Sequence, residues 1–254
     1  MRGWWREITG LVLPVACSGC GTPRTPLCEE CGRALYGGAA RRTRPVPEPA
    51  GLPVVHAAAP YEDAVRAVLL AHKERGALGL ARPLGVALAG AVRASASAGA
   101  AGPLLLVPVP SAPRAVRARG HDAARRIALA AAGELRRTGI EARALPVLRQ
   151  RRAVADQSGL TARQRMVNLA GALEVVPGGG RLLEGGRAVL VDDLMTTGAS
   201  LAEAARALRA AIGLRSSAFV RLRAAVVAAP PLSFEEHRTN RTNGMNRARR
   251  SNRN

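Results

Sequence analysis

The chain has 254 residues, of which 48% are apolar and 2% aromatic, and it carries a formal net charge of +20 at pH 7. This length can bury a full hydrophobic core and fits one main domain with a small addition. The apolar content excludes a wholly disordered chain, and no apolar run is long enough to span a bilayer. The excess of arginine favours a polyanionic or phosphorylated partner, although arginine drift on a solvated surface together with a basic tail would give the same charge.

All four cysteines lie close together near the N-terminus, as Cys17-x2-Cys20 and Cys28-x2-Cys31. Two such pairs joined by a short loop can supply four thiolates to a tetrahedral zinc ion. Two disulfides in a secreted domain, or redox-active cysteine pairs, are the alternatives. We predict a structural zinc ribbon over residues 1–36.

The N-terminal segment imitates a signal peptide with a cleavage site before Cys17. Glu7 and Pro14 interrupt its short apolar region, and Cys17 already has a use in the zinc ribbon. We therefore expect a cytoplasmic protein with no membrane segment.

The rest of the chain divides by composition. Residues 37–57 are rich in Gly, Pro and Arg, which is typical of a linker. Residues 58–228 alternate helical and strand signals and form the expected main domain. Residues 229–254 lack apolar periodicity, so this segment is expected to be a disordered basic tail.

Hydrophobic spacing in the main domain predicts helices and strands in alternation. The helices are expected over residues 61–76, 79–96, 121–139 and 200–213. The strands are expected over residues 103–110, 143–150, 171–176, 185–193 and 216–229. This alternation predicts an α/β fold with a parallel sheet that is covered by helices on both faces.

The segment "VLVDDLMTTGAS" (residues 189–200) combines a buried strand, two aspartates and a small hydroxyl-rich turn that enters a helix. Ligands of open α/β sheets bind at the carboxyl ends of the strands. Free N–H groups at the start of a helix, together with nearby hydroxyls, make a cradle for a phosphate, and Gly198 lets the backbone approach the anion closely. The hydroxyl groups belong to Thr196, Thr197 and Ser200.

Asp192 and Asp193 have the wrong charge to bind that phosphate. Two adjacent carboxylates suit a sugar diol, because each can accept a hydrogen bond from one hydroxyl. The loop therefore indicates a site for a ribose 5-phosphate. A helix-capping role for Asp192, or a Mg²⁺-binding aspartate pair, is the alternative, and no Walker motif is present in the chain.

The same segment resembles the signature with which type I phosphoribosyltransferases bind phosphoribosyl pyrophosphate (PRPP). Three further blocks narrow the resemblance to the ComF family, whose members are competence-related proteins with an N-terminal zinc ribbon. These blocks are "PYEDAVRAVLLAHKERG", "LLVPVPSAPRAVRARGHDAARRIA" and "LRQRRAVADQSGLTARQRMVNLAGAL". The resemblance covers about residues 17–228 and implies the type I phosphoribosyltransferase fold behind a small zinc ribbon.

The resemblance also implies roles for individual residues. Asp192 and Asp193 would take the ribose hydroxyls, and the loop after "LLVPVP" would approach the pyrophosphate. The 5-phosphate would be held by Thr196, Thr197, Gly198, Ala199 (through its backbone) and Ser200. The pyrophosphate loop offers Arg114, Arg119 and Gly120. A mobile hood over the reacting centre would contain Arg151, Arg152, Gln157, Arg165 and Asn168.

Lys73 is the only lysine beside 37 arginines, and the family has a lysine in the corresponding element. A position that accepts only lysine is confined or needs a single compact charge. We expect Lys73 to reach the mouth of the site and to help hold the pyrophosphate or the closed hood, with a simple helix-terminal cation as the alternative.

Two departures from the family pattern concern the base-recognition segment. His121, Asp122 and Ala123 stand where family members usually have an aromatic residue followed by Asn-Gln, and Leu173 stands where an aromatic residue is usual. The implied chemistry is displacement of pyrophosphate from ribose C1 by a nitrogen nucleophile, with Mg²⁺ accompanying PRPP.

A non-catalytic role is the second expectation. The protein would then be an accessory factor in DNA uptake that binds single-stranded DNA and competence helicase-type proteins, and it would use the PRPP fold as a scaffold or sensor. Arginine clusters in residues 114–126, 149–165 and 238–253 can meet a phosphate backbone. Base stacking is poorly served, because the chain has only two each of Trp, Tyr and Phe.

Overall fold

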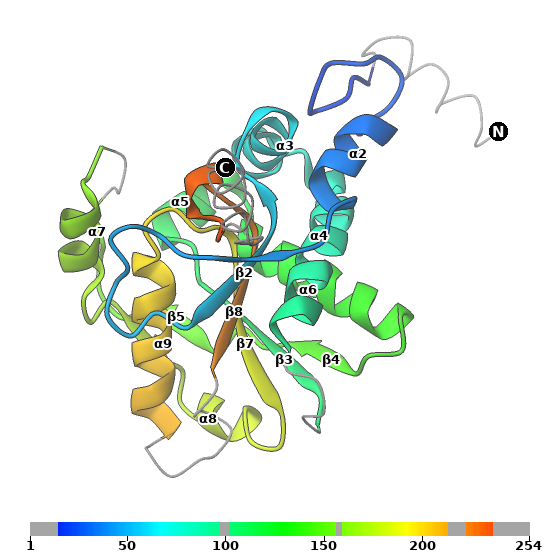
Figure 1. Cartoon of the computed structure of the whole chain (residues 1–254). Coiled ribbons are helices and arrows are strands. Elements are labelled where there is room, and N and C mark those ends of the chain that lie inside the picture. Colours follow the sequence, from blue (N-terminus) through cyan, green and yellow to red (C-terminus); the bar gives the residue numbers. More distant parts are fainter. Residues whose placement is uncertain (1–14, 97–101, 156–158, 213–221, 236–254) are drawn as a thin grey trace, which may run out of the picture.

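A computed structural model describes residues 15–96, 102–155, 159–212 and 222–235 (Figure 1). Its main sheet has six strands in the order β1-β2-β8-β7-β3-β4. Only β1 runs antiparallel to its neighbour, and the other pairs are parallel. The strands are β1 (Arg41–Thr43), β2 (Val54–Pro60), β3 (Leu104–Pro108), β4 (Ala142–Ala144), β7 (Arg187–Leu194) and β8 (Arg223–Ala229).

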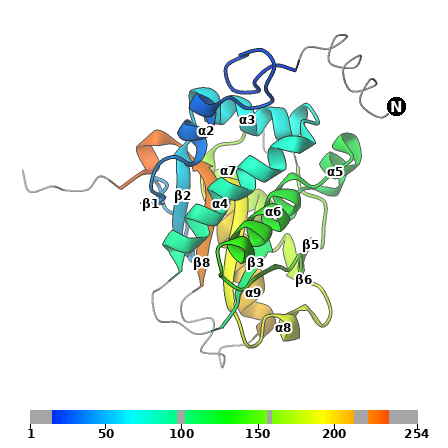
Figure 2. The ribbon, with the colours of Figure 1, turned by 90° about the vertical axis from the view of Figure 1, so that its right-hand side faces the viewer.

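Helices cover both faces of this sheet, which confirms the predicted fold class. Figures 1 and 2 show α9 on the face opposite to α4 and α6. The central strand β7 serves both faces, because Val189 and Val191 join the core under α3, α4 and α6, whereas Ala188 and Leu190 join the core under α9. These helices are α3 (Asp63–Glu74), α4 (Ala81–Ser95), α6 (Ala123–Arg137) and α9 (Ala199–Ile212).

The expected strand at residues 143–150 divides into two short strands in different sheets. β4 pairs with β3 at the edge of the main sheet, whereas β5 (Leu148–Gln150) pairs antiparallel with β6 (Leu173–Val175) in a separate two-stranded sheet. Pro146 lies between them, and its missing N–H and fixed φ suit a break in a strand. The helix α7 (Ala162–Leu169) lies in the connection from β5 to β6.

Residues 37–57 are not simply a linker, which corrects the sequence-based expectation. They supply β1 and the beginning of β2, with Arg41 opposite Ala57 and Thr43 opposite Val55. The side chains of β2 alternate between buried and half-buried positions. The alternation is short and is flanked by Gly and Pro, so the composition of the segment indicated a linker and not a strand.

The cysteine-rich segment leads directly into the main core. Helix α2 (Glu29–Tyr36) begins at Cys28, whose side chain caps it by accepting from the Cys31 N–H. Leu35 near the end of α2 is fully buried in the core under α3 and α4, and Leu27 packs against the same cluster. The ribbon is therefore joined to the main sheet by shared hydrophobic burial.

Residues 229–235 contact the main sheet through Ser233 and Phe234, which corrects the prediction of a disordered tail from residue 229. A 3-10 turn, η3 (Pro231–Ser233), returns this segment to the edge strand β1. Ser233 accepts hydrogen bonds at its carbonyl from the Thr43 hydroxyl at 2.9 Å and from the Arg44 N–H at 2.7 Å. The Arg41 guanidinium lies 4.5 Å from the centre of the Phe234 ring. Residues 236–254, which include the third arginine cluster, lie outside the described residues.

Among the described residues, no helix is long and apolar enough to cross a membrane.

The contacts of residues 231–235 should contribute measurably to stability. A chain that ends at Pro230 should be less stable than a chain that ends at Glu235 by about 2 kcal/mol, or roughly 4–8 °C in Tm, because it loses the Ser233 hydrogen bonds and the Phe234 contact. Thermal unfolding of both chains measures the difference. Equal Tm values would show that the segment adds nothing to the edge of the sheet.

Candidate functional site

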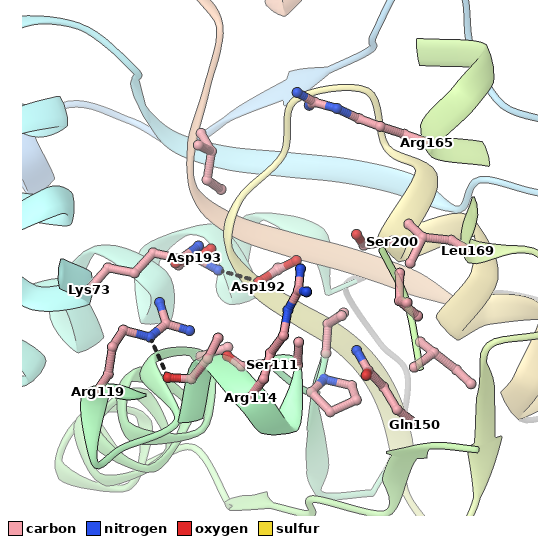
Figure 3. A pocket seen from close by; sticks show the side chains of 18 of the residues that line it. Lys73, Ser111, Arg114, Arg119, Gln150, Arg165, Leu169, Asp192, Asp193 and Ser200 are labelled. Atoms are coloured by element: carbon pink, nitrogen blue, oxygen red, sulfur yellow. Dashed lines mark hydrogen bonds and ion pairs between the residues drawn. The ribbon is translucent and has the colours of Figure 1, made fainter. Parts of the chain in front are cut away.

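A cleft of about 830 Å³ opens at the carboxyl ends of β3 and β7 (Figure 3). Its walls come from the last turn of α3, the loop and helix after β3, the β5–α7 segment and the loop after β7. This is the edge at which parallel sheets bind ligands, and the volume falls in the range of small-molecule sites.

Asp192 and Asp193 stand at the floor of the cleft, where β7 ends. Asp193 is only 5% exposed and Asp192 is half-buried. The Asp193 N–H donates to Asp192 Oδ1 at 2.8 Å. Burial and the neighbouring charge of Asp193 raise the pKa of Asp192 well above its ordinary value.

Lys73 lies in the last turn of α3 and points at this pair. Its Nζ is 2.8 Å from Asp193 Oδ2, and Figure 3 shows the Lys73 side chain reaching toward the two aspartates. Burial acts to lower the pKa of Lys73, but the carboxylates of Asp193 and Asp192 outweigh that effect and raise it. Lys73 thus lines the cleft and contacts the carboxylate pair. The expectation that it helps to hold the pyrophosphate or the closed hood stays a prediction.

The loop after Asp193 leads into α9, which begins at Ala199. Gly198 has φ +74°, a backbone conformation that favours glycine, and a Cβ there would also crowd the Leu52 side chain at 3.1 Å. Thr196 is exposed, and Ser200 lines the main cleft. The start of α9 thus lies close to Asp192, and both line one small pocket.

The segment from β5 to β6 forms one wall of the cleft through Gln150, Val154, Ala155, Arg165 and Leu169. Its helix α7 starts with a capping box formed by Thr161 and Gln164. The Arg165 Nη1 donates to the Thr196 hydroxyl at 3.0 Å, which ties this wall to the loop after β7.

The other expected hood residues have different surroundings. The Arg152 Nη2 donates to the carbonyls of Asn168 at 2.9 Å and Ala170 at 2.8 Å. The Asn168 amide pairs with both backbone groups of Ala155. Arg152 and Asn168 therefore hold the hood in shape from within. Arg151 is exposed and does not line the cleft, and Gln157 lies outside the described residues.

The opposite wall is α5 (Pro113–Arg119), which ends at Gly120 with φ +75°. Arg114 is exposed and lines the cleft, and it has no hydrogen-bond or ion-pair partner in the described part of the chain. The Arg119 Nη1 lies 3.2 Å from Glu74 Oε1, and the Arg119 Nε donates to the Ala115 carbonyl.

His121 and Asp122, which depart from the family pattern, both hold the backbone. Asp122 caps α6 and accepts from the Ser111 hydroxyl at 3.1 Å. The His121 Nε2 lies 3.1 Å from the carbonyl oxygen of the fully buried His72. These two residues therefore fix the loop between α5 and α6 against the end of α3.

Sequence reasoning missed Glu74, Ser111 and Gln150 as cleft residues. Glu74 follows Lys73 directly in the same helix, so the sequence could have placed it near the cleft. Gln150 ends a three-residue strand whose pairing with β6 is only visible in three dimensions. The Gln150 amide faces the cleft without a hydrogen-bond partner among the residues that the structure describes.

The four cysteines form a second candidate site. They are free thiols, and their sulfur atoms all lie within 4.8 Å of one another, which suits a tetrahedral ion with Zn–S bonds of about 2.3 Å. A Cβ at Gly19 would lie 2.6 Å from Cys31 Sγ, so the knuckle closes tightly around the sulfurs. The cluster suggests a structural metal such as Zn²⁺.

The four thiols differ in how readily they ionise. Burial acts to raise the pKa of Cys17, but hydrogen bonds from the backbone of Cys28, Cys20 and Gly19 lower it to about 6. Burial and the neighbouring thiols raise the pKa of Cys31. A cation at the centre would offset this repulsion and allow all four sulfurs to be thiolates.

No model of a known protein family matches this chain, and no curated protein is detectably similar to it. The α/β fold by itself does not identify an activity. A functional assignment must therefore come from the cleft geometry together with the sequence motifs.

The tight knuckle predicts a specific effect on metal retention. Gly19→Ala should weaken zinc binding about tenfold or more, because the new methyl group displaces the Cys31 sulfur. Gly38→Ala is the matched control, since a Cβ at Gly38 meets nothing within 4 Å. Zinc release to a chromogenic chelator measures the effect. Protein purified without chelators that contains no zinc would contradict the assignment.

Proposed function

We propose that the cleft binds PRPP and that the protein is a phosphoribosyltransferase-like protein of the ComF type, which transfers or senses the 5-phosphoribosyl group. The observation that carries this proposal is the position of the Asp192–Asp193 pair beside the N-terminus of α9. The two features suit the two ends of a ribose 5-phosphate, and they line one cleft with the cationic side chains of Arg114 and Arg165.

In this proposal the carboxylates of Asp192 and Asp193 accept hydrogen bonds from the ribose hydroxyls. The backbone N–H groups and hydroxyls of residues 196–200 take the 5-phosphate. Arg114 is unpaired in the described structure and is available to the pyrophosphate, whereas Arg119 must exchange its contact with Glu74. Mg²⁺ would enter with PRPP and would offset part of its charge.

A transferase reaction at this site would break the bond between ribose C1 and the pyrophosphate oxygen. A nitrogen atom of the acceptor would form the new bond to C1, its proton would pass to solvent, and pyrophosphate would leave. Negative charge would grow on the leaving pyrophosphate, and the arginines of α5 would offset it. The acceptor would occupy the wall formed by Gln150, Val154 and Leu169, which offers apolar contact and one amide.

Binding of single-stranded nucleic acid is the second candidate, and the surface beside the cleft favours it. Arg117 and Arg126 are exposed and have no acidic partner in the described part of the chain. Together with the net charge of +20, they provide contacts for a phosphate backbone. This role is compatible with PRPP binding in the same molecule.

The carboxylate pair provides the direct test of the PRPP site. Asp192→Asn and Asp193→Asn should each weaken PRPP binding by roughly ten- to a hundredfold, because each loses a charge-assisted hydrogen bond of about 1.5–3 kcal/mol. Titration calorimetry with Mg²⁺ and PRPP measures the change. Glu184→Gln, an exposed residue away from the cleft, is the matched control. Wild-type affinity in both aspartate variants would refute the site.

The surface arginines provide the test of nucleic-acid binding. Arg117→Gln with Arg126→Gln should weaken binding to a single-stranded oligonucleotide and should reduce its salt slope by about one per lost phosphate contact. Arg181→Gln on α8 (Gly179–Leu182) is the control. Fluorescence anisotropy at several salt concentrations measures both quantities. Binding that is absent at low salt, or a slope that is the same in all variants, would argue against this role.

A further inference from the structure

Three consecutive residues at the end of α3 each contact a different segment around the cleft. The His72 carbonyl contacts His121, Lys73 pairs with Asp193, and Glu74 pairs with Arg119. Val68 and Leu69, one turn earlier, are buried in the main core and fix the helix in place. The packing of α3 against the core therefore sets the position from which the Lys73 side chain extends.

Asp193 has little alternative to this contact. Its side chain is 7% exposed, and Lys73 Nζ at 2.8 Å is its ion-pair partner among the described residues. Asp192 uses Oδ1 to accept from the Asp193 N–H. These contacts use Asp193 Oδ2 and Asp192 Oδ1, and both aspartates line the cleft.

The other charged groups around the pair do not replace Lys73. From α3 the pair also faces Glu74, which is acidic, and His72, whose pKa is lowered by burial. From α5 it faces Arg114 and Arg119, and from α7 it faces Arg165, which is bonded to Thr196. Lys73 is the cation that forms an ion pair with a carboxylate of this pair within the described structure.

Two adjacent carboxylates that are partly removed from water resist joint ionisation, because desolvation and mutual repulsion both favour the protonated form. Burial and Asp193 raise the pKa of Asp192, and the charge of Lys73 acts in the opposite direction. A protonated carboxyl is a poor acceptor for two sugar hydroxyls. Some cation must therefore hold the pair ionised if the pair is to bind a diol at neutral pH.

We propose that Lys73 is a positioning residue that holds the Asp192–Asp193 pair ionised and aimed into the cleft, and so sets the lower pH limit at which the site recognises a vicinal diol. The identity of the diol rests on the proposed function, whereas the effect of Lys73 on the carboxylates does not. This role differs from a direct contact of Lys73 with pyrophosphate, which is the competing interpretation.

A titration of the carboxyl groups tests the electrostatic part without any ligand. The chain has five aspartates, so the ¹³C NMR signals of their carboxyl groups can be assigned and followed with pH. Lys73→Met should move the midpoint of Asp192 upward by about 1–3 pH units, because an opposite charge a few ångströms away is lost. In Lys73→Arg the midpoint of Asp192 should stay close to its wild-type value, because the positive charge is kept. Arg75→Met, which removes an equal charge two residues further on, should leave Asp192 unchanged. An unchanged Asp192 in Lys73→Met would overturn the proposal.

Two partial ligands distinguish the proposed role from contact with pyrophosphate. Lys73→Met should weaken the binding of ribose 5-phosphate by about tenfold at pH 7. The loss of affinity should grow as the pH falls, because diol binding is lost as the pH drops through the raised pKa of Asp192. Magnesium pyrophosphate should bind Lys73→Met and Arg75→Met equally. A selective loss of pyrophosphate affinity in Lys73→Met, or a gain in ribose 5-phosphate affinity, would overturn the proposal.

The same experiments separate this inference from the proposed function. If wild-type protein binds neither PRPP nor ribose 5-phosphate, the proposed function fails, and the Asp192 titration alone decides whether Lys73 holds the pair ionised. Thermal unfolding of Lys73→Met and Lys73→Arg confirms that each variant is folded. If Lys73→Met does not fold, the test uses the Asp192 midpoint in Lys73→Arg, with Arg75→Met as the reference. A larger change of the midpoint in Lys73→Arg than in Arg75→Met supports the proposal, and equal midpoints in the two variants would overturn it.

Discussion

A strand that is buried on both faces yet ends in two carboxylates is the constraint on which this structure depends. β7 lies between β3 and β8, and its side chains alternate between two hydrophobic cores. That packing gives the strand no freedom to move its last residues into water. Asp192 and Asp193 are therefore held at the floor of the cleft, where any charge that they carry must be supported by the protein.

The support comes from a helix on a distant part of the chain. Helix α3 is anchored in the core, and its last three residues contact β7 and the loop between α5 and α6. The cysteine-rich ribbon belongs to the same assembly, because Leu35 of α2 shares the core with α3. A Cβ at Gly19 would also lie 3.3 Å from Ala64 near the start of α3. One helix thus connects the candidate metal site with the carboxylate pair.

The hood contributes shape more than charge. The side chains of Arg152 and Asn168 form hydrogen bonds with the backbone of the hood itself, and Arg165 holds the hood against Thr196. What the hood offers to a ligand is the free amide of Gln150 and the apolar side chains of Val154 and Leu169. In the proposed transfer reaction, an acceptor at this wall would be selected by shape and by one hydrogen-bonding edge, because Arg165 is the only charged residue of this segment that lines the cleft in the described structure.

The sequence alone determined the features that depend on neighbouring residues. Helical and strand periodicity located the main helices, β3 and β7, and the spacing of the cysteines indicated the metal cluster. The aspartates, glycine and hydroxyls of residues 189–200 followed one another closely enough to indicate a cradle beside a carboxylate pair. In each case the residues that form the feature lie within a short stretch of the chain, about one turn or one strand, so local patterns suffice to predict it.

Tertiary structure alone decided the features that join distant segments. β1 has three residues and gains its stability from β2 and from residues 233–235, so neither its own sequence nor that of the C-terminal segment revealed it. The same holds for the pairing of Lys73 with Asp193 and for the internal role of Asn168. A lone lysine could be recognised as unusual, but which charge it meets depends on how α3 packs against β7. That packing is a long-range property, because short segments gain their stability from partners that the local sequence does not specify.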